Sequence, residues 1–440
     1  MLRHVLISGF CLVCLLTPIR SAFGLEENKD RASNGFQKEK PEEDKSKPQS
    51  PAIIKVKAIL PGSKAEQVMT PEMIARRSKV ERCLASYYPA HVNADVLRPW
   101  SIMHGLIAFG QDTLVMSNKK RIDAVDYLCA NGVGNDRRIL YVKNGKLQAR
   151  KGDGYQGHHG QLLAMLAQSD VPIDHPIQVD GKTFTVADLV ELEKKSCRSK
   201  SELTWQLIGL AHYLDSDARW KNSLGQNWNI PRMISEEIVQ PINGAACGGT
   251  HRLMGLSYAV QQRKKEDKPI EGQWRRADNF VKQYHKYTME LQNPDGSFST
   301  DWFEGLSNSG TKTKKISTTG HILEWLIFSM PADQLNDPII DDAIDYLVDA
   351  MLEVPKNQYG VGPKTVGPKG HALRSLRLYE IAMYGESSDY HQTVSDENAI
   401  RDFNIAQQAL AHQEEYLQRI GNRQKREPGP VRSRGIFRRR

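Results

Sequence analysis

The hexapeptide HILEWL at residues 321–326 is the clearest copy of a phrase that recurs along this chain. The phrase is a His, any residue, an apolar residue, two further residues and a second apolar residue. Strong copies begin at 104, 251, 321 and 371, and weaker copies begin at 160 and 205. Successive copies start 45 to 70 residues apart. A repeat near fifty residues in helical sequence is typical of a repeat architecture.

Each copy reads as the start of a helix, and each is preceded by a second helical segment. The preceding segments are expected at 71–88, 119–130, 185–195, 231–240, 273–291 and 338–353. Short β-hairpins are expected at 141–147 and 179–184, where Asn-Gly and Asp-Gly provide turns. Six helix pairs joined this way predict an all-α fold, an (α/α)6 toroid of six inner and six outer helices with small β-hairpins in the connections. An open superhelix is the rival arrangement.

Helix starts are marked by capping residues. Thr70 before Pro71 and Thr185 each predict an N-cap. Residues 199–202 (SKSE) read as a capping box, and residues 317–319 (STT) are expected to lead the fifth phrase helix.

The ends of the chain differ in composition from its body. Residues 1–24 are predicted to be a signal peptide, which indicates export. The remaining divisions are a disordered linker, the toroid, a C-terminal helix and a basic disordered tail, expected at 25–69, 70–390, 391–422 and 423–440.

Charge is unevenly distributed. Of the net charge of +8, the tail contributes +7 and residues 1–24 contribute +2, which leaves about −1 for the rest. A solvated tail or one that binds an anionic surface is therefore expected, rather than a basic groove. No specific nucleic-acid partner and no integral membrane segment are expected.

Four cysteines follow the predicted signal peptide: Cys83, Cys129, Cys197 and Cys247. Two disulfides, Cys83–Cys129 and Cys197–Cys247, are one interpretation for an exported protein, and four buried free thiols are the other. No spacing resembles a CxxC metal site, and no metal or cofactor is expected.

The repeated histidines are candidates for chemistry as well as for architecture. The phrase is expected to place each His in the first turn of an inner helix, where the positive end of the helix dipole keeps the imidazole neutral. Structural capping is the alternative role for any one of them. His159 and His321 are the candidate catalytic histidines, because Gly and Thr residues surround them.

Three loops add candidates. The segment DGYQGHHGQ (153–161) supplies Tyr155 and His158 as ligand-binding residues, and a metal site of His158 with Asp153 is set aside because adjacent histidines on one turn point apart. The segment CGGTHR (247–252) supplies His251 and Arg252 at a glycine-rich helix start suited to an anion.

The third loop, 291–305, contains Asp301 and Glu304 as a candidate acid/base pair, with Trp302 between them as an aromatic platform. The alternative is a polar loop with one anchoring Trp. Gln292 and Asp295 are expected to hold the Pro-Asp-Gly turn of this loop by side-chain hydrogen bonds.

The stretch QNPDGSF (292–298) resembles the Q-x-x-D-G-x-W/F repeat of the squalene/terpene cyclase and protein prenyltransferase superfamily, and TTGHIL (318–323) is similar to the starts of its inner helices. The resemblance covers roughly residues 70–385 and implies the α/α toroid. The D-x-D-D motif of the cyclases is absent, and Cys247 and His321 do not stand in the prenyltransferase zinc contexts. Residues 320–325 also resemble a phrase of (α/α)6 sugar epimerases.

The leading functional hypothesis is an exported ring that binds or acts on a glycan or similar polar substrate at a histidine-rich mouth. Any enzyme would then be a lyase, epimerase or hydrolase. The alternatives are an isoprenoid-handling, cyclase- or transferase-like relative of the superfamily, and a non-catalytic envelope scaffold.

Overall fold

The structure is a computed structural model that describes residues 69–88, 92–354 and 361–385. The predicted signal peptide, nearly all of the predicted linker, the C-terminal helix and the basic tail lie outside these residues. Within them, no helix combines the length and the apolar character needed to cross a membrane.

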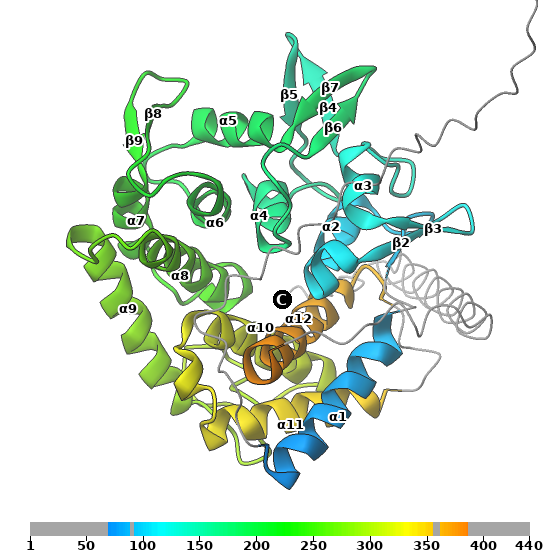
Figure 1. Cartoon of the computed structure of the whole chain (residues 1–440), viewed down its shortest axis with the longest axis vertical. Helices are drawn as coiled ribbons and strands as arrows, with labels where there is room; N and C mark the ends of the chain where they lie inside the picture. The colour runs from blue at the N-terminus through cyan, green and yellow to red at the C-terminus, as the bar shows by residue number, and fades with distance from the viewer. Residues whose placement is uncertain (1–68, 89–91, 355–360, 386–440) are drawn as a thin grey trace, which may run out of the picture. The chain divides into compact units, whose positions relative to one another are not determined.

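The described chain is mostly helical, with small β-hairpins between the helices (Figure 1). Every copy of the phrase lies in a helix or at its start, as predicted. These phrase helices are α2 (Pro99–Phe109), α4 (Gln161–Gln168), α6 (Thr204–Tyr213), α8 (Thr250–Lys265), α10 (Lys312–Ser329) and α12 (Val366–Tyr384). Apolar and small residues cover most of their faces, which is why they are buried along most of their length.

One partner helix precedes each phrase helix. The partners are α1 (Pro71–Tyr87), α3 (Ala124–Cys129), α5 (Val186–Ser196), α7 (Ile230–Ile238), α9 (Gly272–Met289) and α11 (Pro338–Leu352). Each buries only one side, as an amphipathic helix does. Two of the predicted caps are confirmed. Thr70 accepts a hydrogen bond from the Met73 amide at 3.3 Å, and Thr185 forms a capping box with Asp188.

Short strands fill the connections. They are β1 (Val92–Asn93), β2 (Leu114–Ser117), β3 (Lys120–Asp123), β4 (Leu140–Lys143), β5 (Lys146–Ala149), β6 (Pro176–Val179), β7 (Lys182–Thr185), β8 (Arg219–Lys221) and β9 (Asn227–Asn229). Strands β2 and β3, β4 and β5, β6 and β7, and β8 and β9 pair as antiparallel hairpins, and β1 runs parallel to β2. The hairpins predicted at 141–147 and 179–184 are confirmed.

Three local predictions are wrong. The helix expected at 119–130 begins only at Ala124, because Asn118 and Lys119 adopt positive φ and turn the chain into β3. Residues 199–202 form no capping box, since α6 begins at Thr204. Helix α10 starts at Lys312 with Thr311 as its N-cap, so residues 317–319 lie inside it.

The phrase helices pack against one another in a closed sequence. Helix α2 packs on α4, α4 on α6, α6 on α8, α8 on α10, α10 on α12, and α12 returns to α2. The partner helices α1, α5, α7, α9 and α11 lie farther from the middle of the view in Figure 1. Arg374 of α12 reinforces the closure, since its Nη1 donates to the Gln168 and Ile107 carbonyls at the ends of α4 and α2, at 2.8 and 3.3 Å.

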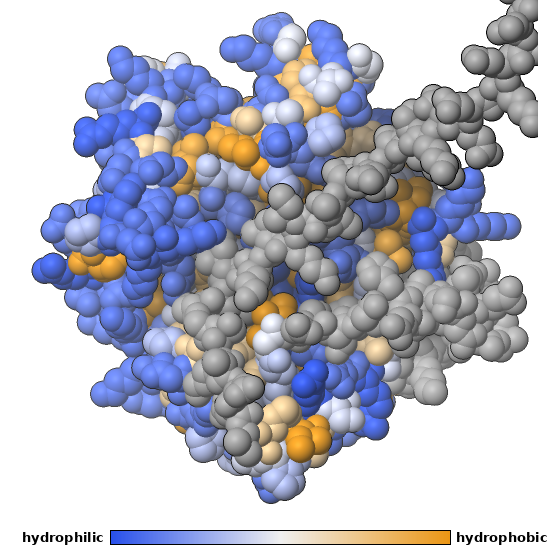
Figure 2. Space-filling view, viewed as in Figure 1, coloured by the Kyte–Doolittle hydropathy of each residue, from blue (hydrophilic) through white to orange (hydrophobic). Residues whose placement is uncertain are grey.

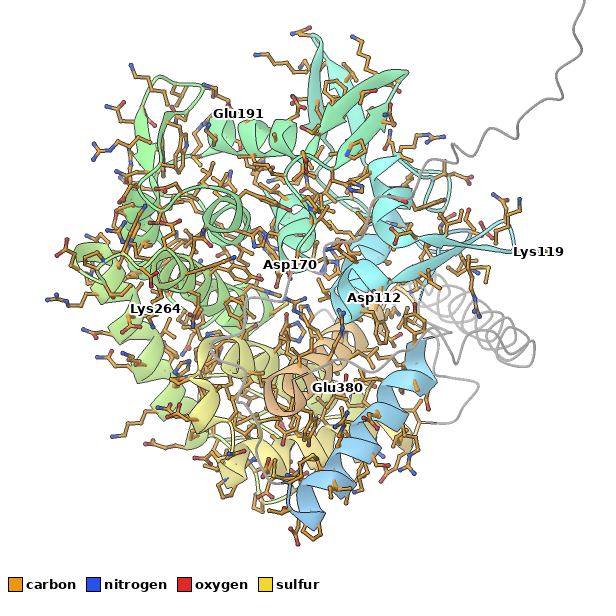
Figure 3. The ribbon with its side chains drawn as sticks, viewed as in Figure 1. Asp112, Lys119, Asp170, Glu191, Lys264 and Glu380 are labelled. Atoms are coloured by element: carbon orange, nitrogen blue, oxygen red, sulfur yellow. The ribbon has the colours of Figure 1, made fainter. Side chains whose placement is uncertain are left out.

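Polar side chains dominate the periphery. The face drawn in Figure 2 is largely hydrophilic over α7 and α9. Lys119 at the tip of the β2–β3 hairpin and Glu191 on α5 lie away from the middle of the view (Figure 3). All four described cysteines are free, so the disulfide interpretation is wrong, and the alternative of four buried free thiols is confirmed for three of them. Cys83, Cys129 and Cys197 are buried, but Cys247 is exposed.

Candidate functional site: a central histidine cluster

Four of the repeated histidines meet where the phrase helices converge. We call His104, His251, His321 and His371 the histidine cluster. They come from α2, α8, α10 and α12, and none is more than 4% exposed. The ring centroids of His321 and His371 are 3.7 Å apart, and His251 lies 5.0 Å from His371 and 5.5 Å from His321. Residues far apart in the sequence therefore form one compact centre.

The position of these histidines in their helices differs from the prediction. Only His251 lies in the first turn of its helix, and the other three lie one or more turns further in. Burial, rather than the helix dipole, is therefore the main reason why they are neutral. Desolvation lowers the pKa of His104, His321 and His371 to about 3 each, and it lowers the pKa of His251 well below its ordinary value. Repulsion from neighbouring imidazoles adds to the effect for His104, His251 and His321.

Backbone carbonyls orient two of the imidazoles. The Nδ1–H of His104 donates to the Trp100 carbonyl at 2.8 Å, and the Nδ1–H of His321 donates to the Ser317 carbonyl at 2.7 Å. Because a carbonyl only accepts hydrogen bonds, the proton of each neutral ring lies on Nδ1. The Nε2 atoms of both residues therefore present lone pairs. That of His104 faces the Gln161 amide at 3.4 Å.

His371 is oriented by a buried carboxylate. Its Nδ1–H donates to Oε2 of Glu324, whose Oε1 lies 2.9 Å from Nε of Arg374. Burial raises the pKa of Glu324 to about 7, and the Arg374 charge opposes this shift. Neither Glu324 nor His371 was singled out as a site residue from the sequence. Both residues belong to copies of the repeated phrase, which was the available signal in the sequence. The phrase did not show that their two side chains would be in contact.

Three tryptophans frame the cluster. Trp100 lies over His104 with ring centroids 3.8 Å apart, and Trp205 lies 4.2 Å from His251. Trp302 meets His321 edge to face at 5.5 Å. Trp205 takes the place of His in the third copy of the phrase, so it continues the ring of aromatic groups.

A rigid loop positions Trp302. Ser299 donates to the Gly305 carbonyl at 2.6 Å, and Phe298 N–H donates to Thr319 of α10 at 3.1 Å. The Trp302 backbone has φ +58°, which is rare for a bulky residue, and its indole covers Gly248 so closely that a Cβ there would lie 2.1 Å from the ring. The loop and the start of α8 are thus fitted to each other.

The turn before α8 brings Cys247 to the cluster. Cys247, Gly248 and Gly249 all have positive φ, at 49°, 63° and 90°. Donor atoms of Cys247, His251 and His321 lie within 4.8 Å of one another. Among the described residues, Nε2 of His251 has no hydrogen-bond partner. Sequence reasoning missed Cys247 as a site residue.

The segment 153–161 lies beside the cluster rather than in it. His158 Nδ1 is hydrogen-bonded to the Glu202 carboxylate at 2.6 Å. Its ring centroid lies 5.7 Å from that of Trp205, one of the tryptophans that frame the cluster. His159 is exposed, and desolvation followed by nearby Lys151 and Arg198 lowers its pKa. Tyr155 lies 5.4 Å from the Arg137 guanidinium. Asp153 pairs with Arg98, so it does not form a site with His158.

Asp301 and Glu304 are exposed, and nothing in the structure pairs them as an acid and a base. The Asp301 carboxylate pairs with Lys314 at 3.2 Å, in the first turn of α10, and this hydrogen bond lowers the pKa of Asp301. Lys314 precedes His321 by about two helical turns. The acid/base role stays a prediction, and the lowered pKa makes Asp301 a poor proton donor.

Arg252 is held in a buried polar network, which argues against its predicted role as a ligand-binding residue. Its Nε pairs with buried Glu237 at 3.0 Å, and its two terminal nitrogens donate to the Pro241 carbonyl and the Gln240 side chain. These contacts use three of its five N–H groups, and the side chain is buried.

The turn after α9 behaves as predicted. Gln292 donates to the Gly296 carbonyl at 3.1 Å and to the Ile339 carbonyl at 2.7 Å, and Asp295 accepts from the Ser297 hydroxyl and amide.

A separate cavity of about 660 Å³ lies between α8, α9 and the end of α10, and no member of the histidine cluster lines it.

Compared with known proteins, the chain matches no family model, no curated protein and no solved structure. The chemistry of this chain must therefore be argued from the cluster itself.

Proposed function

We propose that the chain is a closed (α/α)6 toroid that binds an uncharged, hydroxyl-rich molecule, a glycan or similar polar substrate, over the histidine cluster. The return of α12 to α2 and the alternation of partner and phrase helices support the toroid. Export by a signal peptide at 1–24 remains part of the proposal.

The lone pairs of the imidazole nitrogens determine which class of ligand we propose. His321 presents an unprotonated Nε2, and Nε2 of His251 has no partner among the described residues. Lone pairs accept hydrogen bonds from hydroxyl groups and repel phosphate and carboxylate oxygens. An apolar chain would leave these buried nitrogens unsatisfied, at a cost of about 1–3 kcal/mol each. A hydroxyl-rich ligand therefore fits better than an isoprenoid.

Access to the cluster comes from the side of Cys247 and Trp302, which are exposed and partly exposed, respectively. The flat indole of Trp302 suits stacking against the C–H face of a sugar ring. With their pKa values lowered to about 3, His321 and His371 are weak bases near pH 7, so in this scheme the imidazoles act as hydrogen-bond acceptors for the ligand rather than as general bases. Asp301 and Glu304 do not enter this scheme.

Calorimetric titration of the full chain tests the proposal. The probes are neutral cello-, xylo- and chito-oligosaccharides, with farnesyl diphosphate as the competing class. We expect at least one saccharide to bind, and Trp302→Leu and His321→Phe each to weaken binding about tenfold, the equivalent of about 1.4 kcal/mol.

Asp301→Asn is the matched control, because it alters an exposed residue of the same loop, and it should bind as the wild type does. Binding of farnesyl diphosphate without any saccharide would instead support the isoprenoid alternative. Binding of neither class would favour the scaffold.

A further inference from the structure

We propose that Cys247, His251 and His321 form a three-ligand site for a zinc-class transition-metal ion. The inference rests on the same centre as the proposed function, but it changes how the ligand is held. Nε2 atoms that bind a metal no longer accept hydrogen bonds from hydroxyl groups, so the ligand would instead bind at the open position of the metal. The observation behind it is that one donor atom from each residue lies within 4.8 Å of the other two. Among the residues that the structure describes, this is the one group of three such ligands brought so close together.

The spacing is close to that of a zinc site. Zinc binds sulfur at about 2.3 Å and imidazole nitrogen at about 2.0–2.1 Å, so neighbouring ligand atoms in a tetrahedron are roughly 3.4–3.6 Å apart. The donor atoms here lie within 4.8 Å of one another. A tetrahedral site therefore requires the donor atoms to move about 1 Å closer to one another, a change on the scale of a side-chain rotation.

An independent observation points to a ligand at this position. His251 is only 4% exposed, and its Nε2 has no partner among the described residues. Its ring lies among Trp205, His321 and His371, at 4.2 to 5.5 Å. A buried nitrogen without a hydrogen bond destabilises the fold, and a bound cation would remove that penalty.

His321 is prepared to bind through Nε2. Its Nδ1–H is held by the Ser317 carbonyl at 2.7 Å, which selects the tautomer whose Nε2 carries the lone pair. Metal-bound histidines are usually oriented in this way by a carbonyl or carboxylate on the other ring nitrogen.

The ligand types select the metal. Thiolate and imidazole donors favour zinc and similar ions over magnesium and calcium, which prefer oxygen. Binding replaces the thiol proton of Cys247 with the metal and releases one proton to solvent. Three protein ligands leave the fourth tetrahedral position for water or substrate, which is the arrangement of catalytic zinc sites. Cys247 is the exposed member of the three ligands, whereas His251 and His321 are buried.

Cobalt titration of the chelator-treated full chain tests the site. We expect one equivalent of Co²⁺ to bind with the absorption of tetrahedral cobalt and a thiolate-to-cobalt charge-transfer band, and excess Zn²⁺ to displace it. Cys247→Ser should abolish the charge-transfer band, and His251→Gln and His321→Gln should each weaken binding at least tenfold. The matched controls Cys129→Ser and His285→Gln, which replace residues outside the site, should leave the band unchanged.

A second measurement uses the wild-type chain, so its result does not depend on whether the histidine variants fold. Cys247 is exposed, whereas Cys83, Cys129 and Cys197 are buried, so iodoacetamide should modify Cys247 before those three. Peptide mass mapping should show that Zn²⁺ slows alkylation of Cys247 at least tenfold and that Mg²⁺ does not. The inference is overturned if Co²⁺ gives no charge-transfer band, or if Zn²⁺ leaves the alkylation rate of Cys247 unchanged.

The two proposals fail separately. Saccharide binding that is unaffected by chelator, together with no Co²⁺ band, overturns the metal site alone. A Cys247-dependent Co²⁺ band without saccharide binding retains the metal site and overturns the proposed ligand.

Discussion

The imidazole rings of His321 and His371 stack with centroids 3.7 Å apart and planes 31° apart, although they belong to different helices. This contact requires α10 and α12 to approach closely, and Gly320 makes the approach feasible. A Cβ at Gly320 would lie 2.8 Å from both Cα and N of Ala372, which are backbone atoms that cannot rotate away. The arrangement of the cluster thus depends on a residue with no side chain.

Gly320→Ala should therefore destabilise the fold by about 1–3 kcal/mol, because the two helices must separate to admit the methyl group. Urea unfolding followed by circular dichroism measures the change. Gly367→Ala in α12 is the control. Its Cβ would meet nothing closer than Trp100 at 3.9 Å, and the gain in helix propensity should stabilise the chain by about 0.5–1 kcal/mol. An unchanged unfolding midpoint for Gly320→Ala would contradict the packing described.

Glu324→Gln should reduce the free energy of unfolding by about 3 kcal/mol. The amide can still accept from His371, but the buried Arg374 charge loses its partner, and uncompensated buried charge is strongly unfavourable. Glu191→Gln removes the exposed partner of Lys194 and should change stability by less than about 1 kcal/mol. If the two variants had equal stability, the ion pair would not be important for the fold.

Stability should fall as the pH is lowered below about 6.5. Desolvation lowers the folded-state pKa of His104, His321 and His371 to about 3, so between pH 6.5 and 3 the unfolded chain binds more protons than the folded chain. Each such histidine contributes stability that is present above pH 6.5 and lost at about 1.4 kcal/mol per pH unit below it. Urea unfolding at pH 7.5, 6.5 and 5.5 measures the slope, and His104→Phe should make it shallower. A free energy of unfolding independent of pH over this range would count against neutral, buried histidines.

Arg252→Lys should destabilise the chain by about 1–3 kcal/mol and leave ligand affinity unchanged. Lysine keeps the charge but cannot reproduce the three contacts that the guanidinium makes to Glu237, Gln240 and Pro241. Arg276→Lys, at an exposed residue of α9 whose guanidinium donates to the Gln273 side chain at 3.1 Å, is the control and should stay within about 0.5 kcal/mol. A loss of ligand binding with no loss of stability would restore Arg252 as a binding residue.

The order of partner and phrase helices was predictable from the sequence because hydrophobic periodicity and capping residues act locally. The same holds for the turn that Gln292 and Asp295 stabilise and for the hairpin at Asn144. Local reasoning failed at Lys119, where the sequence is compatible with a helix but a turn at positive φ forms a strand instead.

The repeat and the positions of most helices were therefore readable from the sequence, whereas the histidines are neutral because the fold buries them. Only the tertiary structure decided which polar residues meet. In the folded chain the Cys247 thiol lies near the imidazoles of His251 and His321. The Glu324 carboxylate contacts His371, and the Asp301 carboxylate pairs with Lys314. The reason is physical: capping and periodicity depend on neighbours within one or two turns, whereas a cluster depends on how distant helices rotate and how closely they pack.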